Sequence, residues 1–270
     1  MNCLLLMEYP CVLKCIAAGD LGQTDSMAST LEHIAGYDYH ILLFAGDLSY
    51  ADKNQFLWDT FGHMVSAYAN YQPWMVTEGN HEIKDNPLLE SFVSTTPAGT
   101  CLTRRADHVQ TYLGKVDRTK MPWLITVLHA PWYNSNSAHQ HDGDAVMAAM
   151  EFMHYNAHFN IVFAGHLHAF EHMERVHLRQ SDPCGILYIT IGDGGNIEGL
   201  ARIWLDPQFV WSMFQESSFG HGELKFVDAT HAYWSWNRNH DAISIMADDV
   251  WITSLSAAQS GCIPSSIMGC

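Results

Sequence analysis

Short, continuous apolar runs recur between residues 12 and 191, and most end at a glycine beside a polar residue. Runs of this length without alternation are typical of strands buried on both faces, as in a parallel sheet covered by helices. The strands expected on this basis cover residues 12–17, 39–44, 74–77, 123–128, 161–164 and 187–191. Segments of helical periodicity lie between them, at residues 26–35, 54–69 and 144–154. The sequence therefore predicts a layered α/β domain.

The pattern changes after residue 200, where the periodicity becomes β-like and hairpin-like. Strands are expected there at residues 223–227, 231–236 and 242–252. A chain of 270 residues with 48% apolar content can fill one large core. We therefore expect a single catalytic domain over residues 1–270, with its core at about 12–255 and a flexible tail at 256–270.

The overall charge limits the partners. Lys and Arg number 13 and Asp and Glu number 29, which gives a formal net charge of −16. This charge disfavours nucleic-acid backbones and anionic membrane surfaces. No stretch approaches the roughly 20 apolar residues that a membrane helix needs. A small molecule is therefore the expected partner, and a phosphate ester would need a strong local positive centre.

Cysteine usage and the N-terminus leave the cellular compartment open. The seven cysteines are scattered and form no CxxC pair, which argues against a zinc ribbon or a thioredoxin-like motif. The apolar run near the N-terminus is only about four residues long and lacks a basic flank, so it makes a poor signal peptide.

Side chains able to bind metal follow five of the expected strands. They are Asp20, Asp47, Asn80, His129 and the pair His166 and His168. Each alone is more often a turn residue, a helix cap or a structural histidine, and a lone HxH pair is weak support for metal binding. Five such sites in order, all at strand exits, favour a centre of two metal ions. Such a centre clamps the attacking and leaving oxygens of a displacement at phosphorus, which predicts a dinuclear phosphoesterase.

The blocks GDLG, GDLSYAD, GNHE, VLHAPWYNSN and GHLHAFE, in this order, resemble the five motifs of the calcineurin-like metallophosphoesterases. Tyr50, the PWYNSN block and the stretch YITIGDGGNIEGLA resemble more narrowly the plant-type purple acid phosphatases. The resemblance implies a four-layer αββα sandwich with mixed sheets. It also implies an acid phosphatase that hydrolyses phosphate monoesters by attack of a metal-bound hydroxide.

The resemblance implies a role for each candidate ligand. A ferric ion would be held by Asp20, Tyr50 and His168. A divalent ion (zinc, manganese or iron) would be held by Asn80, His129 and His166, and Asp47 would bridge the two ions. The donor chemistry agrees, because a hard trivalent ion prefers carboxylate and phenolate oxygen, whereas imidazoles suit a borderline divalent ion.

Further catalytic residues are implied by position in the same motifs. His81 and His139 match positions that contact the phosphate group, and Asp142 stands where the family has a glutamate. The family also suggests a secreted or vacuolar protein and a possible homodimer.

One departure from the family concerns packing. The segment from Lys84 to Met121 is shorter than the family's and lacks an apolar core strand, so the strands that end at Asn80 and His129 are expected to lose a packing partner. Two other functions stay open. One is a phosphodiesterase or pyrophosphatase on the same centre, and the other is a catalytically impaired, truncated metal-binding product.

Overall fold

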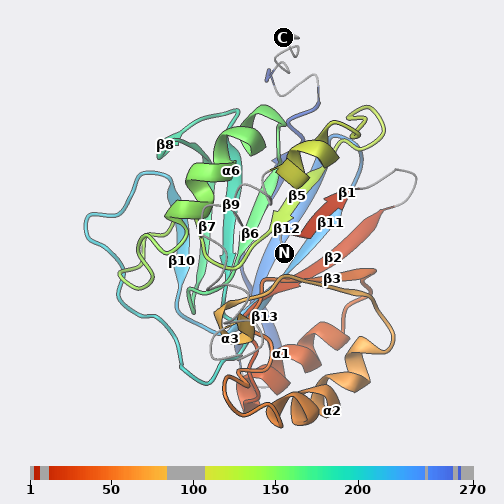
Figure 1. Cartoon of the computed structure of the whole chain (residues 1–270), viewed down its shortest axis with the longest axis vertical. Coiled ribbons are helices and arrows are strands. Elements are labelled where there is room, and N and C mark those ends of the chain that lie inside the picture. Colours follow the sequence, from red (N-terminus) through yellow and green to blue (C-terminus); the bar gives the residue numbers. More distant parts are fainter. Residues whose placement is uncertain (1–2, 7–11, 84–106, 241–242, 258–260, 263–270) are drawn as a thin grey trace.

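Two β-sheets pack face to face between two layers of helices in the computed structural model of the chain (Figure 1). The model describes residues 3–6, 12–83, 107–240, 243–257 and 261–262. Helices α1 (Asp25–Ala35) and α2 (Leu57–Ala69) lie on one side of the sheets, and α6 (Asp144–Asn156) lies on the other. The predicted four-layer αββα sandwich with mixed sheets is confirmed.

The first sheet has the strand order β13-β12-β11-β2-β3-β4. Its parallel half consists of β2 (Leu13–Ala18), β3 (Ile41–Phe44) and β4 (Trp74–Val76). Its antiparallel half consists of β11 (Gly220–Phe226), β12 (His231–His240) and β13 (Ile243–Thr253). The apolar side chains of α1, including Met27, Leu31 and Ile34, pack on this sheet because they recur at helical spacing.

The second sheet has the strand order β1-β5-β6-β9-β7-β10, and β8 pairs with β7. Its parallel centre consists of β5 (Leu124–Val127), β6 (Ile161–Ala164) and β9 (Ile186–Ile191). Its antiparallel strands are β1 (Cys3–Leu6), β7 (Phe170–His177), β8 (Gln180–Ser181) and β10 (Ser212–Glu216).

Large aromatic side chains fill the space between the sheets. Trp234 and Trp236 on β12 are fully buried. Trp236 stacks on Phe170 of the second sheet, and Trp234 packs at a tilt against Phe163. Burying a large apolar side chain contributes roughly 1.5–3 kcal/mol. This core holds the carboxyl ends of the parallel strands in place, and the candidate ligands extend from those ends.

Strand β1 corrects one expectation. It lies before residue 12, where the core was expected to begin, and it pairs antiparallel with β5 from Cys3 to Leu6. The strand that ends at His129 therefore has a neighbour on both sides, and the expectation that it loses a partner is wrong. Strand β4, which precedes Asn80, does lie at a sheet edge.

The expected long segment without a strand falls mostly on residues 84–106, which lie outside the described residues, whereas residues 107–113 are helical. The expected tail at 256–270 also lies largely outside them. Its described part includes Cys262, which forms a disulfide with Cys184. Within the described residues, no helix is both long enough and apolar enough to cross a bilayer.

Candidate metal centre

The polar residues after the parallel strands sit in sharply turned backbone. Asp20, Asp47, Tyr50 and His166 all have positive φ values, between 51° and 65°. This conformation costs an ordinary L-residue roughly 1–2 kcal/mol, and such strain gathers at functional sites. Backbone hydrogen bonds between neighbouring strand exits hold these turns, such as the bond from the Asp20 amide to the Gly46 carbonyl. The fold therefore turns these side chains inward at one edge of the two sheets.

A first group of donors consists of Asp20, Tyr50 and His168. The Tyr50 hydroxyl lies 3.3 Å from Oδ1 of Asp20 and 3.0 Å from Nε2 of His168. Nε2 of His168 lies 3.4 Å from the same Asp20 oxygen. The other ring nitrogen of His168, Nδ1, lies 3.1 Å from the Gly199 carbonyl, so Nδ1 carries the proton and Nε2 is left with a lone pair.

A second group contains Asn80, His129, His166 and Asp47. Nε2 of His129 lies 2.9 Å from Oδ1 of Asn80 and 3.1 Å from Oδ2 of Asp47. Nδ1 of His129 lies 2.7 Å from the Ala45 carbonyl, which again leaves a lone pair on Nε2. Donor atoms of Asp47, His129 and His166 lie within 4.8 Å of one another.

These donor sets fit cations. Ligands about 2.0–2.2 Å from one ion lie roughly 3.0–3.4 Å from one another, which is the spacing seen in both groups. In the second group, Nε2 of His129 and two oxygen acceptors converge on one point, where a bound cation would replace the proton that the raised pKa of His129 otherwise keeps on this ring. Oδ2 of Asp47 is buried and has no hydrogen-bond partner among the described residues. Such a carboxylate oxygen needs a positive charge beside it.

The pKa shifts of Tyr50 and His129 arise from burial and from the charges of Asp20 and Asp47. Burial and the charges of Asp20 and Asp47 raise the pKa of the Tyr50 hydroxyl well above its usual range, so this phenol ionises only against a cation. Burial disfavours the charged form of His129, but Asp47 and Asp20 outweigh it and raise the pKa of His129 to about 9. Asp47 acts on residues of both groups, as a bridging carboxylate would.

Two glycines leave room for the carboxylates. A Cβ atom on Gly79 would lie 2.1 Å from Oδ1 of Asp47, and one on Gly165 would lie 2.4 Å from Oδ2 of Asp20. Both distances are far inside van der Waals contact. A side chain at either position would displace a candidate ligand.

The sequence of the chain is similar to those of known phosphatases. The model of the calcineurin-like phosphoesterases matches residues 13–170, and that of the iron/zinc purple acid phosphatase-like protein C matches residues 185–247. The chain is 46% identical to purple acid phosphatase 22 and 41% identical to probable purple acid phosphatase 20, both of Arabidopsis thaliana, over 92% of its length. The chain belongs to the purple acid phosphatases. It spans 65% and 67% of these two relatives.

Solved structures agree with the fold. A purple acid phosphatase from yellow lupin superposes with a TM-score of 0.73 over 97% of this chain and 58% of its own, at 17% identity. The protein GAP50 of Plasmodium superposes with a TM-score of 0.71 over 91% of this chain and 90% of its own, at 13% identity. The alignment with purple acid phosphatase 22 runs over 283 positions, which is more than the 270 residues of this chain. The relative therefore has residues within the matched region that this purple acid phosphatase lacks.

His81 packs beside the first donor group. Its ring centroid lies 4.1 Å from that of Tyr50, and its Nδ1 lies 2.7 Å from Oδ1 of Asp52. Its Nε2 lies 3.6 Å from Oε1 of Glu198, a half-exposed residue in the loop after β9. The structure thus brings His81 to the edge of the centre, with one ring nitrogen anchored.

His139 and Asp142 lie beside the second group. Oδ2 of Asp142 lies 3.1 Å from Nδ1 of His139 and 3.0 Å from Nε2 of His166. The rings of His139 and His166 lie 3.9 Å apart. Partial burial opposes ionisation of Asp142, but the bonds from His166 and His139 outweigh it and lower its pKa. All ten candidate residues predicted from the sequence therefore lie in these two groups or in contact with them.

Three further acidic residues were not predicted from the sequence. Glu82 accepts hydrogen bonds from the backbone amides of Asp47, Leu48 and Gly79, each at 2.8 Å, and so fixes two of the turns. Asp52 orients His81, and Glu198 faces it. Glu82 and Asp52 lie within the GNHE and GDLSYAD motifs, which was a usable signal. Glu198 lies within the stretch YITIGDGGNIEGLA, from which no site residue was predicted.

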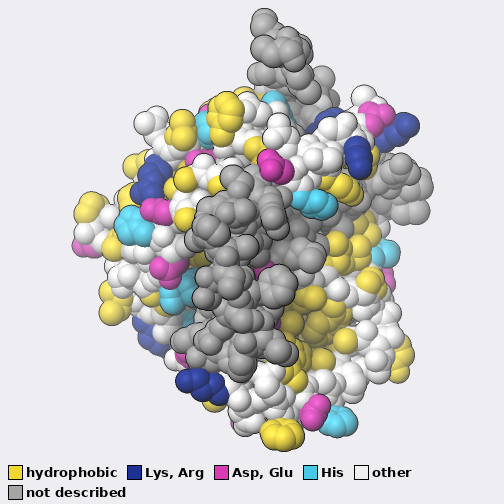
Figure 2. Space-filling model, viewed as in Figure 1, with side chains coloured by type: hydrophobic (Ala, Val, Ile, Leu, Met, Phe, Trp, Pro, Cys, Tyr) yellow, Lys and Arg dark blue, Asp and Glu magenta, His cyan; other side chains and the backbone are white. Residues whose placement is uncertain are grey.

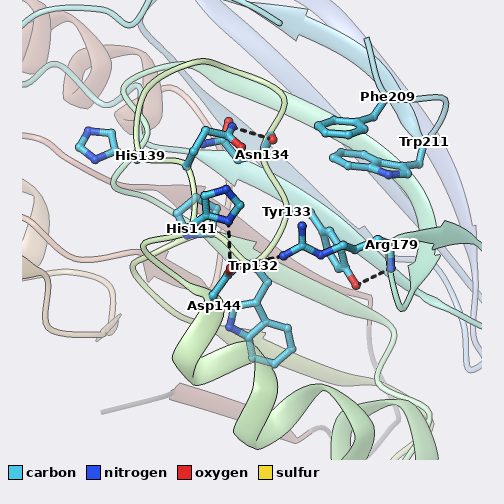
Figure 3. A pocket seen from close by; sticks show the side chains of 11 residues that line it. Trp132, Tyr133, Asn134, His139, His141, Asp144, Arg179, Phe209 and Trp211 are labelled. Carbon is cyan, nitrogen blue, oxygen red and sulfur yellow. Dashed lines mark hydrogen bonds and ion pairs between the residues drawn. The ribbon is translucent and has the colours of Figure 1, made fainter. Parts of the chain in front are cut away.

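A small cavity lies behind the loop that carries His139 (Figure 3). Its volume is about 60 Å³, and Phe209 stacks on Trp211 along one wall, with ring centroids 4.6 Å apart. His141 faces Asp144 on the other side. A space of this size holds a water molecule or two, so it does not suit the organic part of a substrate.

The surface agrees with the charge count. On the face shown in Figure 2, the Lys and Arg side chains of the described residues lie among acidic and apolar ones and form no continuous basic surface.

Proposed function

We propose that this purple acid phosphatase hydrolyses small phosphate monoesters at a centre that holds a ferric and a divalent ion. The observation that supports this most directly is the pair of three-donor groups on either side of Asp47, whose buried Oδ2 has no hydrogen-bond partner among the described residues. Bound ions supply Lewis acidity toward the phosphoryl oxygens and activate water as the nucleophile.

The donor chemistry supports an assignment of each ion. Asp20 and Tyr50 offer a carboxylate and a phenolate, which suit Fe(III), and His168 completes this group. His129 and His166 with the Asn80 amide oxygen suit a zinc, manganese or iron(II) ion. A relative that is 37% identical to this chain is named Fe(3+)-Zn(2+) purple acid phosphatase 12.

We assign the binding of the phosphoryl group to two histidines. His81 packs on Tyr50 of the first group, whereas His139 packs on His166 of the second. In each histidine Nδ1 donates to an aspartate, so Nε2 would donate to a phosphoryl oxygen with the ring in its imidazolium form. Charge that develops on those oxygens in the transition state would strengthen both hydrogen bonds.

Metal analysis, a visible spectrum and two chromogenic substrates test this proposal. We expect about one iron and one divalent ion per chain, a purple phenolate-to-iron band, and faster turnover of p-nitrophenyl phosphate than of bis(p-nitrophenyl) phosphate. Preference for the diester would favour the phosphodiesterase alternative. Both metals without turnover would favour the catalytically impaired product.

The compartment and the assembly stay predictions. The disulfide between Cys184 and Cys262 supports an oxidising compartment such as the secretory route or the vacuole, since cytosolic thiols are kept reduced. A homodimer is suggested by the family resemblance alone.

A further inference from the structure

The three histidines of the centre differ in what fixes their outer ring nitrogen. His129 and His168 each bond a backbone carbonyl, of Ala45 and Gly199. His166 instead bonds the side-chain carboxylate of Asp142. A metal-binding histidine usually needs such an outer partner, because the partner sets the tautomer, the orientation and the basicity of the ring.

The two kinds of partner differ in charge and in mobility. The Ala45 and Gly199 carbonyls belong to the main chain, and the rings that they orient are more than nine-tenths buried. Asp142 is 47% exposed, and His166 is the most exposed of the three rings, at 14%. The orientation of His166 therefore depends on one charged side chain that solvent reaches.

Asp142 also joins two functions. Its Oδ2 contacts Nε2 of His166 and Nδ1 of His139, both within 3.1 Å. His139 and His166 both have left-handed backbone, with φ of 56° and 65°. Each residue therefore lies in a tight turn, which restricts the direction in which its ring can point. One carboxylate oxygen thus contacts both a candidate metal ligand and a candidate phosphate ligand, and it can orient both rings.

We infer that Asp142 is a positioning residue for the divalent ion, and does not itself bind the phosphate group. By accepting the Nε2 proton of His166, it leaves the Nδ1 lone pair of that ring for the ion. Its negative charge would repel a phosphate dianion, whereas it raises the basicity of the imidazole it contacts. This inference rests on the proposed function. It adds that His166 is the one histidine ligand oriented by a solvent-exposed side chain, so that binding of the divalent ion depends on Asp142.

Zinc binding to the purified full chain tests the inference without turnover. Metal-depleted wild type and Asp142→Ala protein are titrated with zinc by calorimetry, and the iron-loaded proteins are titrated in the same way. We expect a 10–100-fold weaker zinc Kd for Asp142→Ala, with the iron content and the visible band unchanged. Asp142→Glu keeps the carboxylate and should recover much of the affinity.

Asp144→Ala is a matched control. Asp144 lies two residues further along the chain and contacts Nδ1 of His141 at 2.9 Å, in the same i, i+3 arrangement that joins Asp142 to His139. It removes the same charge close by without touching His166. A zinc Kd near the wild-type value is therefore expected for this variant.

Two results would overturn the inference. One is equal zinc affinity in Asp142→Ala and wild type, and the other is an equal loss in Asp144→Ala, which would point to charge alone. Failure of the proposed function looks different. In that case the wild type itself would show no visible band and no monoester turnover, whatever the zinc titrations of the two variants give.

Discussion

The two donor groups lie in different surroundings. In the group of Asp20, Tyr50 and His168, no side chain is more than 8% exposed. In the second group, His166 is 14% exposed, and its Nε2 contacts the half-exposed Asp142. The first group is thus closed by the protein, and the second opens to solvent. The two groups thus differ in what orients their histidines, which is a main-chain carbonyl for His168 and a half-exposed carboxylate for His166.

The difference follows from where the strands lie. Asp20 follows β2, which sits in the middle of its sheet between β11 and β3. Asn80 follows β4, which is an edge strand, and its three residues are half-buried or exposed. A site at the exit of an edge strand has packing on one side only. The second group therefore relies more on side-chain partners.

The largest effect should come from Asp47→Asn, because Asp47 is the carboxylate proposed to bridge the two ions. We expect loss of both metals and a fall in turnover well beyond the roughly 10–100-fold that an outer-shell change costs. Metal analysis and monoester turnover check this.

Asn80→Ala is the comparison variant for Asp47→Asn. It should lose the divalent ion and keep iron, since Asn80 belongs to the second group only. Iron loss in Asn80→Ala as large as in Asp47→Asn would mean that the two halves are not separate.

Gly79→Ala should disturb the same carboxylate through packing. The new Cβ atom would lie 2.1 Å from Oδ1 of Asp47, so the aspartate must move. A displacement near 1 Å costs about a hundredfold in rate, which is the loss we expect in kcat.

Gly62→Ala is the control for Gly79→Ala. Gly62 lies within α2, and a Cβ atom there meets no heavy atom within 4 Å. Alanine should raise the free energy of unfolding by roughly 0.5–1 kcal/mol and leave turnover unchanged. Full activity in Gly79→Ala would show that the turn at Asp47 tolerates movement.

Tyr50→Phe should affect the visible band of the first donor group without affecting metal binding by the second. Since the pKa of this buried phenol is raised, the purple band requires Tyr50 bound to iron as phenolate. We expect the band to vanish while zinc binding stays within a fewfold of wild type. A visible spectrum and a zinc titration on the same sample check this. Unchanged absorption would exclude Tyr50 as a ligand.

Much of this arrangement could be predicted from the sequence, because strand exits and their motifs are local features. The run before His166 predicts a strand, and glycine with histidine after it predicts a turn with donors. The outer partners could not be predicted in the same way. Ala45 and Gly199 act through main-chain carbonyls, which carry no residue signature, and Asp142 meets His166 across 24 residues.

Four strands were not predicted, namely β1, β7, β8 and β10, and the physical reason is plain for two of them. Strand β7 carries buried polar residues such as Glu171, whose carboxylate is satisfied by Ser135 and Ser212, so its apolar pattern is broken. Strand β1 is only four residues long, and its pairing with β5 spans more than 100 residues of sequence. Neither a short run nor a distant partner is visible to periodicity.

A last expected effect concerns stability rather than metal binding or turnover, and it comes from a buried histidine behind the second group. His154 on α6 is buried, and its Nε2 lies 2.9 Å from the Thr126 hydroxyl on β5, the strand that leads to His129. Burial lowers the pKa of His154 to about 4, below its ordinary value of about 6.5. The unfolded chain therefore binds a proton that the folded chain does not, and stability falls as the pH drops from 6.5 toward 4.

Urea unfolding of metal-depleted protein at pH 7 and pH 4.5 measures this effect and excludes metal loss as its cause. His154 should account for about 2–3 kcal/mol of the fall in the wild type. His154→Gln keeps a side chain that can bond Thr126 but has no proton to gain, so its fall should be smaller by that amount. Because His154 contacts β5, which leads to His129, the second donor group should be the one that is sensitive to acid. An equal fall in both proteins would show that His154 binds a proton equally in the folded and the unfolded chain, and the difference between the two halves would then rest on the edge position of β4 and on Asp142 alone.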